Sequence, residues 1–559
     1  MGASSDDRTA FVDVPRSTEV SGGGPESPGT RRALRLALLV PWISAALVLA
    51  LSLIVGREKL ERWNRDELGR MIAKAGTPED VRQVEQGDDY TRTAVLALAA
   101  AGLMLLVLER VQRRSRDPFA GHWRPLGAEG ISAAKLAWLL SGLVLVFWVH
   151  RLVRDSVDLE TMPTYPLNVF QPILHATGLA FALAFVAVFF WAWCREDGSA
   201  ALAWAVGLLL LFLGNLVQGG WFEGFVAPFV LSKIQYYHEA LRIQDWRAWT
   251  AGFNEAQASL TNHARTHPPF AELVHWLPWK LCGVSGLSAL FVLATSVAVP
   301  ALHATLRALG CEAARAYRLS LLFAVLPAFN VYGAVCLDGL ILAAGSVSLL
   351  GLVRIDRGPA RMGDFLLFAG GLLALNLLSF GGLLPYAIAG LVGLRRAASG
   401  RWSVLSAVVL AALALVFAWL AMRAGLGYDH RQALATASSL ENPDGFALFH
   451  DPADYIATRV EGFVEFFLFL SLAVVAWFLR GSSWRRDPSG GFAHAALAIF
   501  FLALALGTYR HGETARTCLF LYPYVLLALR DIPVRALDAC LFLAALQTVL
   551  QQLTGFFFW

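Results

Sequence analysis

Long apolar runs recur along the chain from Leu34 to its C-terminal end, and short breaks that carry arginine separate them. A helix needs about 20 mostly apolar residues to cross the hydrocarbon core of a bilayer. In hydrocarbon only helices and closed barrels satisfy their backbone hydrogen bonds, and the alternating ten-residue segments of a barrel are not seen. The pattern therefore predicts an all-α, polytopic transmembrane bundle of roughly 13–15 spans.

The boundaries of the predicted spans have a precision of a few residues. They are 33–55, 93–110, 133–150, 172–194, 200–218, 285–307, 317–334, 338–354, 363–380, 383–394, 402–422, 457–479, 491–507, 515–530 and 536–555. The short pieces between 317 and 394 are candidates for broken or re-entrant helices. Residues 1–30 are rich in Gly, Ser, Pro and Asp, which predicts a disordered cytoplasmic tail ahead of N-terminal spans in 31–198 and a second region, 199–559.

Arginine clusters orient these spans, because cytoplasmic loops carry the excess of Arg and Lys. All the clusters can be placed inside together, which puts four breaks outside: 56–92, 219–284, 423–456 and 508–514. The loop 56–92 has mixed charge and no unusual grouping, so we interpret it as a structural cap. The loop 219–284 is rich in Trp and Tyr, which settle at the level of the lipid headgroups. Its last part, Pro268 to Leu281, predicts a helix that begins at the proline pair and lies along the interface.

Composition excludes several classes of protein. Of the 559 residues, 57% are hydrophobic and 16% charged, too apolar a balance for a soluble chain of this size. The net charge of +4 is spread over short loops, which argues against a nucleic-acid partner. The six cysteines are scattered, without the spacing of a zinc site, and are interpreted as core residues.

Four motifs follow one another in the outer loop 219–284. They are Tyr237-His238-Glu239-Ala240, Gln244-Asp245-Trp246, Thr266-His267-Pro268-Pro269 and Lys280-Leu281-Cys282-Gly283. Their order resembles the first outer loop of the GT-C class of membrane glycosyltransferases, the superfamily of protein O-mannosyltransferases and lipid A aminoarabinose transferases. The stretch from Gly512 to Pro523, GETARTCLFLYP, is similar to a segment near the C-terminal end of bacterial members, and the loop Gly425 to His430 is familiar from such chains. The resemblance runs from about residue 200 to 530.

The resemblance implies an inverting enzyme that moves a sugar from a polyprenyl-phosphate donor to a glycan, lipid or protein acceptor. The reaction would take place on the extracytoplasmic face of a bacterial inner membrane, where nucleotide sugars are absent. No nucleotide-binding glycine motif occurs in the inner loops. Some members of the superfamily use a divalent cation and others do not, so a metal requirement stays open. A lipid or glycan flippase, or a non-catalytic partner in envelope glycan assembly, is the alternative.

Transfer from a lipid phosphate needs a carboxylate that deprotonates the acceptor hydroxyl and cations that stabilise the departing phosphate. A guanidinium binds phosphate in a fork and keeps its charge, so arginine is preferred to histidine as the cation. Candidates for these roles come from the outer loops and the adjoining span ends. They are the carboxylates Glu223, Glu239, Asp245 and Glu255, the arginines Arg265, Arg459, Arg510 and Arg516, and the histidines His263, His267, His430 and His511.

The chain departs from the family pattern where the base is expected. The usual motif is Asp-Glu-Ala, and here His238 occupies the position of the Asp. Either Glu239 has taken over as the general base, or Asp245 has, or the activity is lost. Assigned to substrate binding are His238, Arg265, His267, Tyr428, Arg459, Arg510, Glu513 and Arg516.

Several of these residues also have a purely structural interpretation. Glu239 and Arg242 are three residues apart and could form an exposed helical ion pair, as could Glu513 and Arg516. Thr266 and His267 could simply begin a helix. Asp338 lies between two short apolar runs, where a turn at an outer boundary is favoured over a functional charge.

Overall fold

The computed structural model describes residues 176–554, apart from 196–197, 232–234, 360, 480–488, 490 and 508–512. The predicted tail, the first three spans, the loop 56–92, Arg510 and His511 lie outside the described residues. Every regular element in the described part is a helix, with no strand among them, which supports the all-α prediction.

The helices follow one another along the chain, with η2 a π-helix and η3 to η5 3-10 helices. They are α6 (Ala176–Trp193), α7 (Ala200–Leu216), η2 (Phe222–Val226), α8 (Ala227–Val230), α9 (Tyr236–Ala240), α10 (Trp246–Ala256), η3 (Gln257–Ser259), α11 (Asn262–Arg265), α12 (Phe270–Ser296), α13 (Ala298–Ala308), α14 (Ala313–Ala324), α15 (Pro327–Tyr332), α16 (Leu337–Arg357), α17 (Met362–Leu378), η4 (Phe380–Leu383), α18 (Leu384–Ala397), α19 (Ser403–Leu426), α20 (His430–Glu441), α21 (Ala447–His450), α22 (Pro452–Phe469), α23 (Leu472–Leu479), α25 (Phe492–Ala505), α26 (Thr514–Thr517), η5 (Leu519–Leu521), α27 (Tyr522–Leu527) and α28 (Val534–Thr554).

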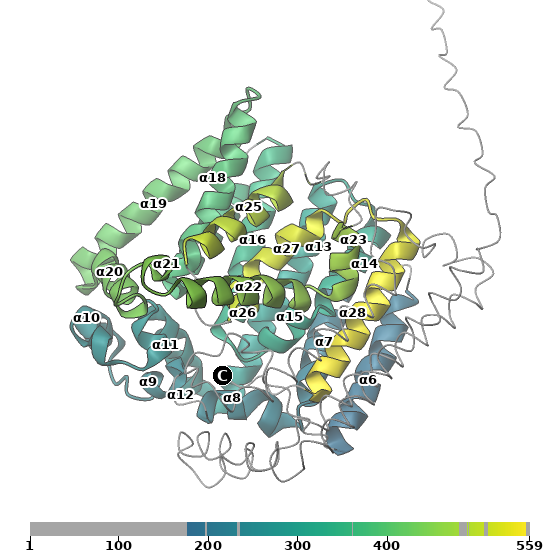
Figure 1. Cartoon of the computed structure of the whole chain (residues 1–559), viewed down its shortest axis with the longest axis horizontal. Coiled ribbons are helices and arrows are strands. Elements are labelled where there is room, and N and C mark those ends of the chain that lie inside the picture. The colour runs from purple at the N-terminus through teal and green to yellow at the C-terminus, as the bar shows by residue number, and fades with distance from the viewer. Residues whose placement is uncertain are drawn as a thin grey trace, which may run out of the picture.

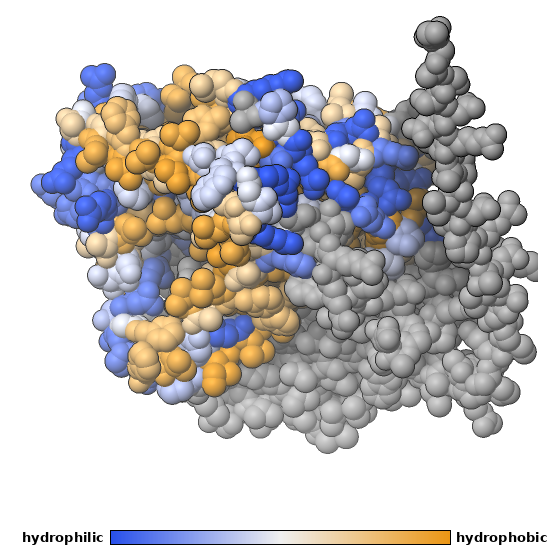
Figure 2. Space-filling model, turned by 90° about the horizontal axis from the view of Figure 1, so that it is seen from above, coloured by the Kyte–Doolittle hydropathy of each residue, from blue (hydrophilic) through white to orange (hydrophobic). Residues whose placement is uncertain are grey.

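Four helical stretches are long and apolar enough to cross a membrane: Phe270–Ala308, Leu337–Arg357, Ser403–Leu426 and Val534–Leu553. Of these, α19 is the most exposed, and Phe417 on it is 73% exposed. In Figure 2 broad apolar areas adjoin polar patches on the visible face. An apolar surface of this kind suits a lipid environment better than water. The described part therefore has the character of a membrane protein.

The helix α16 is at the centre of the packing, where it contacts α12, α13 and α17. The last helix, α28, returns to pack against α6, α7 and α14, so the two ends of the described part lie side by side (Figure 1). Predicted spans in this central part agree closely with the helices. The span 338–354, for example, corresponds to α16, which runs from Leu337 to Arg357.

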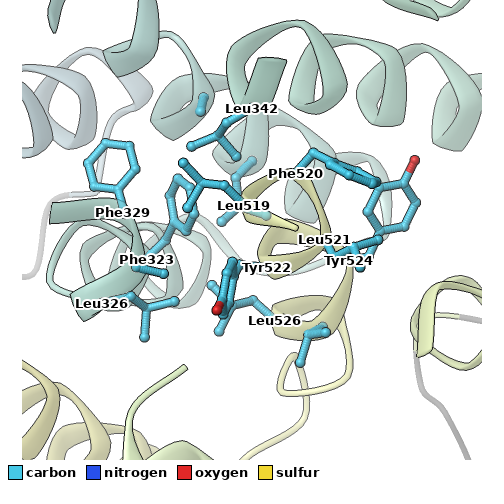
Figure 3. Packing of buried hydrophobic residues seen from close by; sticks show 14 of the residues in the cluster. Phe323, Leu326, Phe329, Leu342, Leu519, Phe520, Leu521, Tyr522, Tyr524 and Leu526 are labelled. Atoms are coloured by element: carbon cyan, nitrogen blue, oxygen red, sulfur yellow. The ribbon is translucent and has the colours of Figure 1, made fainter. Parts of the chain in front are cut away.

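The prediction of one continuous span over 515–530 is wrong. The segment consists of α26, η5 and α27, and α27 begins with Pro523 in its first turn. Figure 3 shows Leu519, Phe520 and Tyr522 among core residues of α14, α15 and α16. Backbone outside a regular helix is tolerated at membrane depth only where protein surrounds it. The apolar sequence therefore reflects a buried segment.

Two other predicted spans are also interrupted. Residues 317–334 divide into α14 and α15 at Pro327, and Leu326 before it is extended, as a residue preceding proline prefers. Residues 457–479 divide into α22 and α23 at Ser471, which has a φ of 79°. The first of these breaks falls in the region that the sequence predicts to hold broken helices.

The predicted outer loop 219–284 folds into short helices followed by the first half of α12. This helix begins directly after Pro268-Pro269, as predicted, and Gly283 interrupts it with a φ of 68°. The loop lies against the second predicted outer loop, because Asn254 Nδ2 donates to Asp429 O at 2.9 Å and Gln257 Nε2 donates to Ala433 O at 2.9 Å. The segments 219–284 and 423–456 thus share one side of the molecule.

Candidate functional site

Arg516 is the centre of a buried ionic cluster at the edge of these loops. Its Nε lies 3.5 Å from Asp338 Oδ2, and its Nη2 donates to Glu513 Oε2. The thiol of Cys336 donates to Asp338 Oδ2 at 3.0 Å. The pair Glu513–Arg516 expected from the three-residue spacing is therefore present, and a second carboxylate from the first turn of α16 joins it. Asp338 is not a turn residue, because it belongs to that helix.

Aromatic rings from the outer loop form a wall next to this cluster. Tyr236 packs against His267 with ring centroids 5.1 Å apart, against His275 at 5.3 Å and against His263 at 5.8 Å. Burial raises the pKa of Tyr236 well above its usual range, and the negative charge of Asp338 adds to the effect. The phenol therefore stays neutral.

The two histidines of the Asn-His-Ala-Arg-Thr-His segment are neutral as well. Burial and, after it, the positive charge of Arg516 lower the pKa of His263 to about 3. The pKa of His267 also falls to about 3, first through burial and then through His263 and Arg516. Since Arg516 acts on both rings, the segment 263–267 and the segment 513–516 lie close together. His267 Nδ1 donates to His263 O at 3.0 Å, so its neutral ring can only accept a further hydrogen bond through Nε2.

Glu239, the predicted base, is buried with both carboxylate oxygens engaged. Its Oε2 accepts from Arg242 Nη1 at 3.0 Å, and its Oε1 accepts from Thr261 N at 3.0 Å. The ion pair with Arg242 is the structural interpretation that the sequence allowed. Asp245 is the exposed N-cap of α10 and accepts from Arg247 N at 2.8 Å. A catalytic role for either carboxylate stays a prediction.

Of the other predicted site residues, Arg265 and His238 lie on helices of the outer loop 219–284, and Tyr428 and Arg459 lie elsewhere. Arg265 lies on α11 between the two histidines, and its Nε is buried without a hydrogen bond. His238 lies next to Glu239 on α9, with its ring against Tyr237. Tyr428 belongs to a separate apolar cluster, where its hydroxyl is 3.1 Å from His430 Nδ1. Arg459 holds the C-terminal end of α25 by donating to Leu504 O at 2.7 Å.

Sequence reasoning missed three residues of this neighbourhood: Tyr236, Glu272 and Glu465. Glu272, in the first turn of α12, is fully buried, and neither of its carboxylate oxygens makes a hydrogen bond. Glu465 lies inside the predicted span 457–479 and accepts hydrogen bonds from the backbone of α26. A carboxylate inside an apolar run is the signal that could have identified both.

A small hollow adjoins the ionic cluster through Cys336. The other residues that line it are Asn215, Gln218, Gly224, Pro228, Gln235, Val331, Tyr332, Val335 and Gln552. The amides of Asn215, Gln218 and Gln552 already make hydrogen bonds within the protein. With a volume of about 30 Å³, the hollow has room for a water molecule.

Within the described ranges, no group of three or more His, Cys, Asp or Glu side chains is arranged to hold a metal ion. A scan against models of protein families, a search of curated proteins and a search of solved structures each found no match to the chain.

Proposed function

We propose that the chain is a multi-pass membrane glycosyltransferase of the GT-C type, which transfers a sugar from a polyprenyl-phosphate donor to an acceptor on the extracytoplasmic face of a bacterial inner membrane. One observation carries the proposal: His263 and His267 of the Thr-His-Pro-Pro region pack together against Tyr236, and the charge of Arg516, from the Gly-Glu-Thr-Ala-Arg segment, acts on both histidines and on Tyr236. These are the segments on which the resemblance to the GT-C class rests. Chance similarity gives no reason for them to meet at one buried cation.

In this proposal the donor phosphate replaces one of the two carboxylates that pair with Arg516, those of Glu513 and Asp338. The side chain of Glu513 is 26% exposed and that of Asp338 is 13% exposed, so Glu513 is the carboxylate that gives way. The guanidinium fork then faces the phosphate oxygens, and Asp338 keeps its orientation. His267 keeps its Nδ1–H bonded to His263 O at 3.0 Å, and both neutral histidines border the phosphate without adding charge.

Glu239 remains the proposed base, with Asp245 as the alternative. Arg242 is 70% exposed, so its bond to Glu239 is weak and can yield to an acceptor hydroxyl. The engagement of both Glu239 oxygens in the free protein favours a second candidate, a non-catalytic partner in envelope glycan assembly, in which Glu239 only holds α9 to the following loop.

Sugar transfer from radiolabelled polyprenyl-phosphate sugars by the purified protein tests the proposal. Transfer should be present in the wild type, reduced in Arg516→Lys and lowest in Arg516→Ala. Arg423→Ala is the matched control, because Arg423 is an exposed arginine that pairs with Asp429 at 3.2 Å. A well-folded wild type that transfers no sugar from any such donor would rule out the transferase and leave the non-catalytic partner.

A further inference from the structure

Glu465 on α22 is fully buried, and its carboxylate accepts hydrogen bonds from the first residues of α26. Its Oε2 accepts from Thr514 N at 2.9 Å, and its Oε1 accepts from Ala515 N at 3.0 Å. These two residues lie directly between Glu513 and Arg516 in the chain. Because one carboxylate binds two successive amides, it fixes both the position and the direction of this turn.

Other contacts of α22 dock the same segment. A Cβ added at Gly462 would lie 2.6 Å from Thr514 Oγ1, so the absence of a side chain lets the two elements approach closely. The hydroxyl of Tyr522 donates to Phe466 O at 3.0 Å, and the two rings stack with centroids 4.7 Å apart. Gly462, Glu465 and Phe466 share one face of α22, since they are three and four residues apart. Figure 1 shows α22 and α26 side by side.

A carboxylate that served packing alone would be energetically unfavourable at this buried position. Burying a charge costs free energy unless hydrogen bonds compensate for it, and a neutral polar side chain could also cap a short helix. The carboxylate adds two charge-assisted hydrogen bonds to successive backbone amides. These bonds resist rotation of the turn. That turn carries both groups that meet at the ionic cluster with Asp338.

We infer that Glu465 is a positioning residue for the donor-phosphate site. It holds α26 so that the guanidinium of Arg516 keeps its direction towards Asp338 when Glu513 gives way to the phosphate. The inference rests on the proposed function for its phosphate, and on the contacts above for its geometry. Glu465 acts through Arg516 and does not touch the substrate.

A double-mutant cycle of Glu465→Gln and Arg516→Lys tests this. Glu465→Gln keeps the volume but sets an amide NH₂ against a backbone N–H, so it should raise the donor KM about tenfold with kcat changed less than about twofold. In the Arg516→Lys background the same change should raise the donor KM hardly at all, because the fork that Glu465 aims is already lost. Glu465→Asp, which keeps the charge, should fall between wild type and Glu465→Gln, and it replaces Glu465→Gln if that variant does not fold.

Gln547→Leu is the matched control for loss of a cap. Gln547 Oε1 accepts from Leu472 N at 3.0 Å, and its Nε2 donates to Leu468 O at 2.8 Å, so it joins backbone groups at the far end of α22 in a similar way. Its loss should lower the thermal unfolding temperature without changing the donor KM. An unchanged donor KM in Glu465→Gln, or equal rises in both Arg516 backgrounds, would overturn the inference.

The same double-mutant cycle is also measured by the unfolding temperature, because this measurement does not require an active enzyme. If the wild type transfers no sugar but the two changes are non-additive in unfolding temperature, the proposed function fails while the coupling of Glu465 to Arg516 stands. Additive changes in the unfolding temperature of such an inactive protein would remove the positioning role as well.

Discussion

The Nε of Arg516 lies 3.5 Å from Asp338 Oδ2, and this pair joins α26 to the first turn of α16. The two segments are far apart in the sequence, and both side chains are largely buried. A carboxylate in the first turn of a helix is also stabilised by the helix dipole. The pair therefore links the central helix of the bundle to the outer segment on which the proposed phosphate site depends.

Replacing Arg516 by alanine should be strongly destabilising. The change leaves two largely buried carboxylates without their cation, and breaking a buried pair in this way costs about 3–5 kcal/mol. Arg516→Lys keeps the charge and should cost less. Thermal or denaturant unfolding in detergent measures both. Arg423→Ala, which breaks an exposed pair, should stay within about 1 kcal/mol of wild type. Equal losses in Arg516→Ala and Arg423→Ala would contradict the buried pair.

Glu239→Gln should lower turnover by about 10²–10⁴-fold if Glu239 is the general base. Asp245→Asn is an informative comparison, because asparagine caps a helix as well as aspartate does and the N-cap of α10 is kept. A loss of turnover in Asp245→Asn therefore reports chemistry and not folding. Near-normal turnover in Glu239→Gln with an inactive Asp245→Asn would move the base to Asp245.

Helices that the sequence predicts well are those whose signal is local. For α16, α17 and α19, apolar length and bordering arginines set the ends, and the predicted ranges differ from the observed ones by a few residues. The helix after Pro268-Pro269 is also a local signal, since proline suits the first turn.

The features that the sequence did not predict depend on distant partners. Nothing near Asp338 in the chain indicates a cation, because Arg516 reaches it only through the tertiary fold. The breaks in 515–530 follow from burial among α14, α15 and α16 and from the grip of Glu465 on α26, neither of which a hydropathy pattern contains. The convergence of the segments 263–267 and 513–516 was expected only through the family resemblance.

Stability should fall in acid because His263 and His267 are buried in their neutral form. The pKa of each is about 3 in the folded chain, against an ordinary value of 6.5. Between these values the unfolded chain binds protons that the folded chain does not, so stability present above pH 6.5 is lost as the pH falls towards 3. The loss of stability is measured as the unfolding temperature of wild type and of the double variant His263→Gln/His267→Gln between about pH 7.5 and 4.5. This range brackets the pKa of an ordinary histidine. The double variant should lose less stability on acidification, and parallel curves would contradict the assignment.

An exposed cysteine in η3 tests the orientation of the outer loops. Gln257 is a poor position, because it is fully buried and bonded to Arg265 O and Ala433 O, whereas its neighbour Ala258 is exposed. Cys194 and Cys282 are exposed, so the interpretation of all six cysteines as core residues is wrong for these two. In a background without them, Ala258→Cys should react with an impermeant reagent in intact cells. Ala398→Cys, exposed in a predicted inner loop, should react only after permeabilisation. The reverse pattern would invert the topology and with it the extracytoplasmic site.

Gly283 divides α12 into a part that belongs to the outer loop and a part that is apolar enough to enter the membrane. Its φ of 68° with ψ of −174° is a conformation that essentially only glycine adopts, and a side chain there costs about 1–3 kcal/mol although no atom lies in its way. Gly283→Ala should therefore lower the unfolding temperature through backbone strain alone. Gly252→Ala is the matched control, because Gly252 lies within α10, also with nothing near its Cβ position, and alanine there should stabilise by about 0.5–1 kcal/mol. The opposite signs of the two changes separate backbone strain from any general effect of adding a methyl group. If Gly283→Ala were neutral, α12 would run straight through this position, and the interfacial placement of its first half would lose its structural basis.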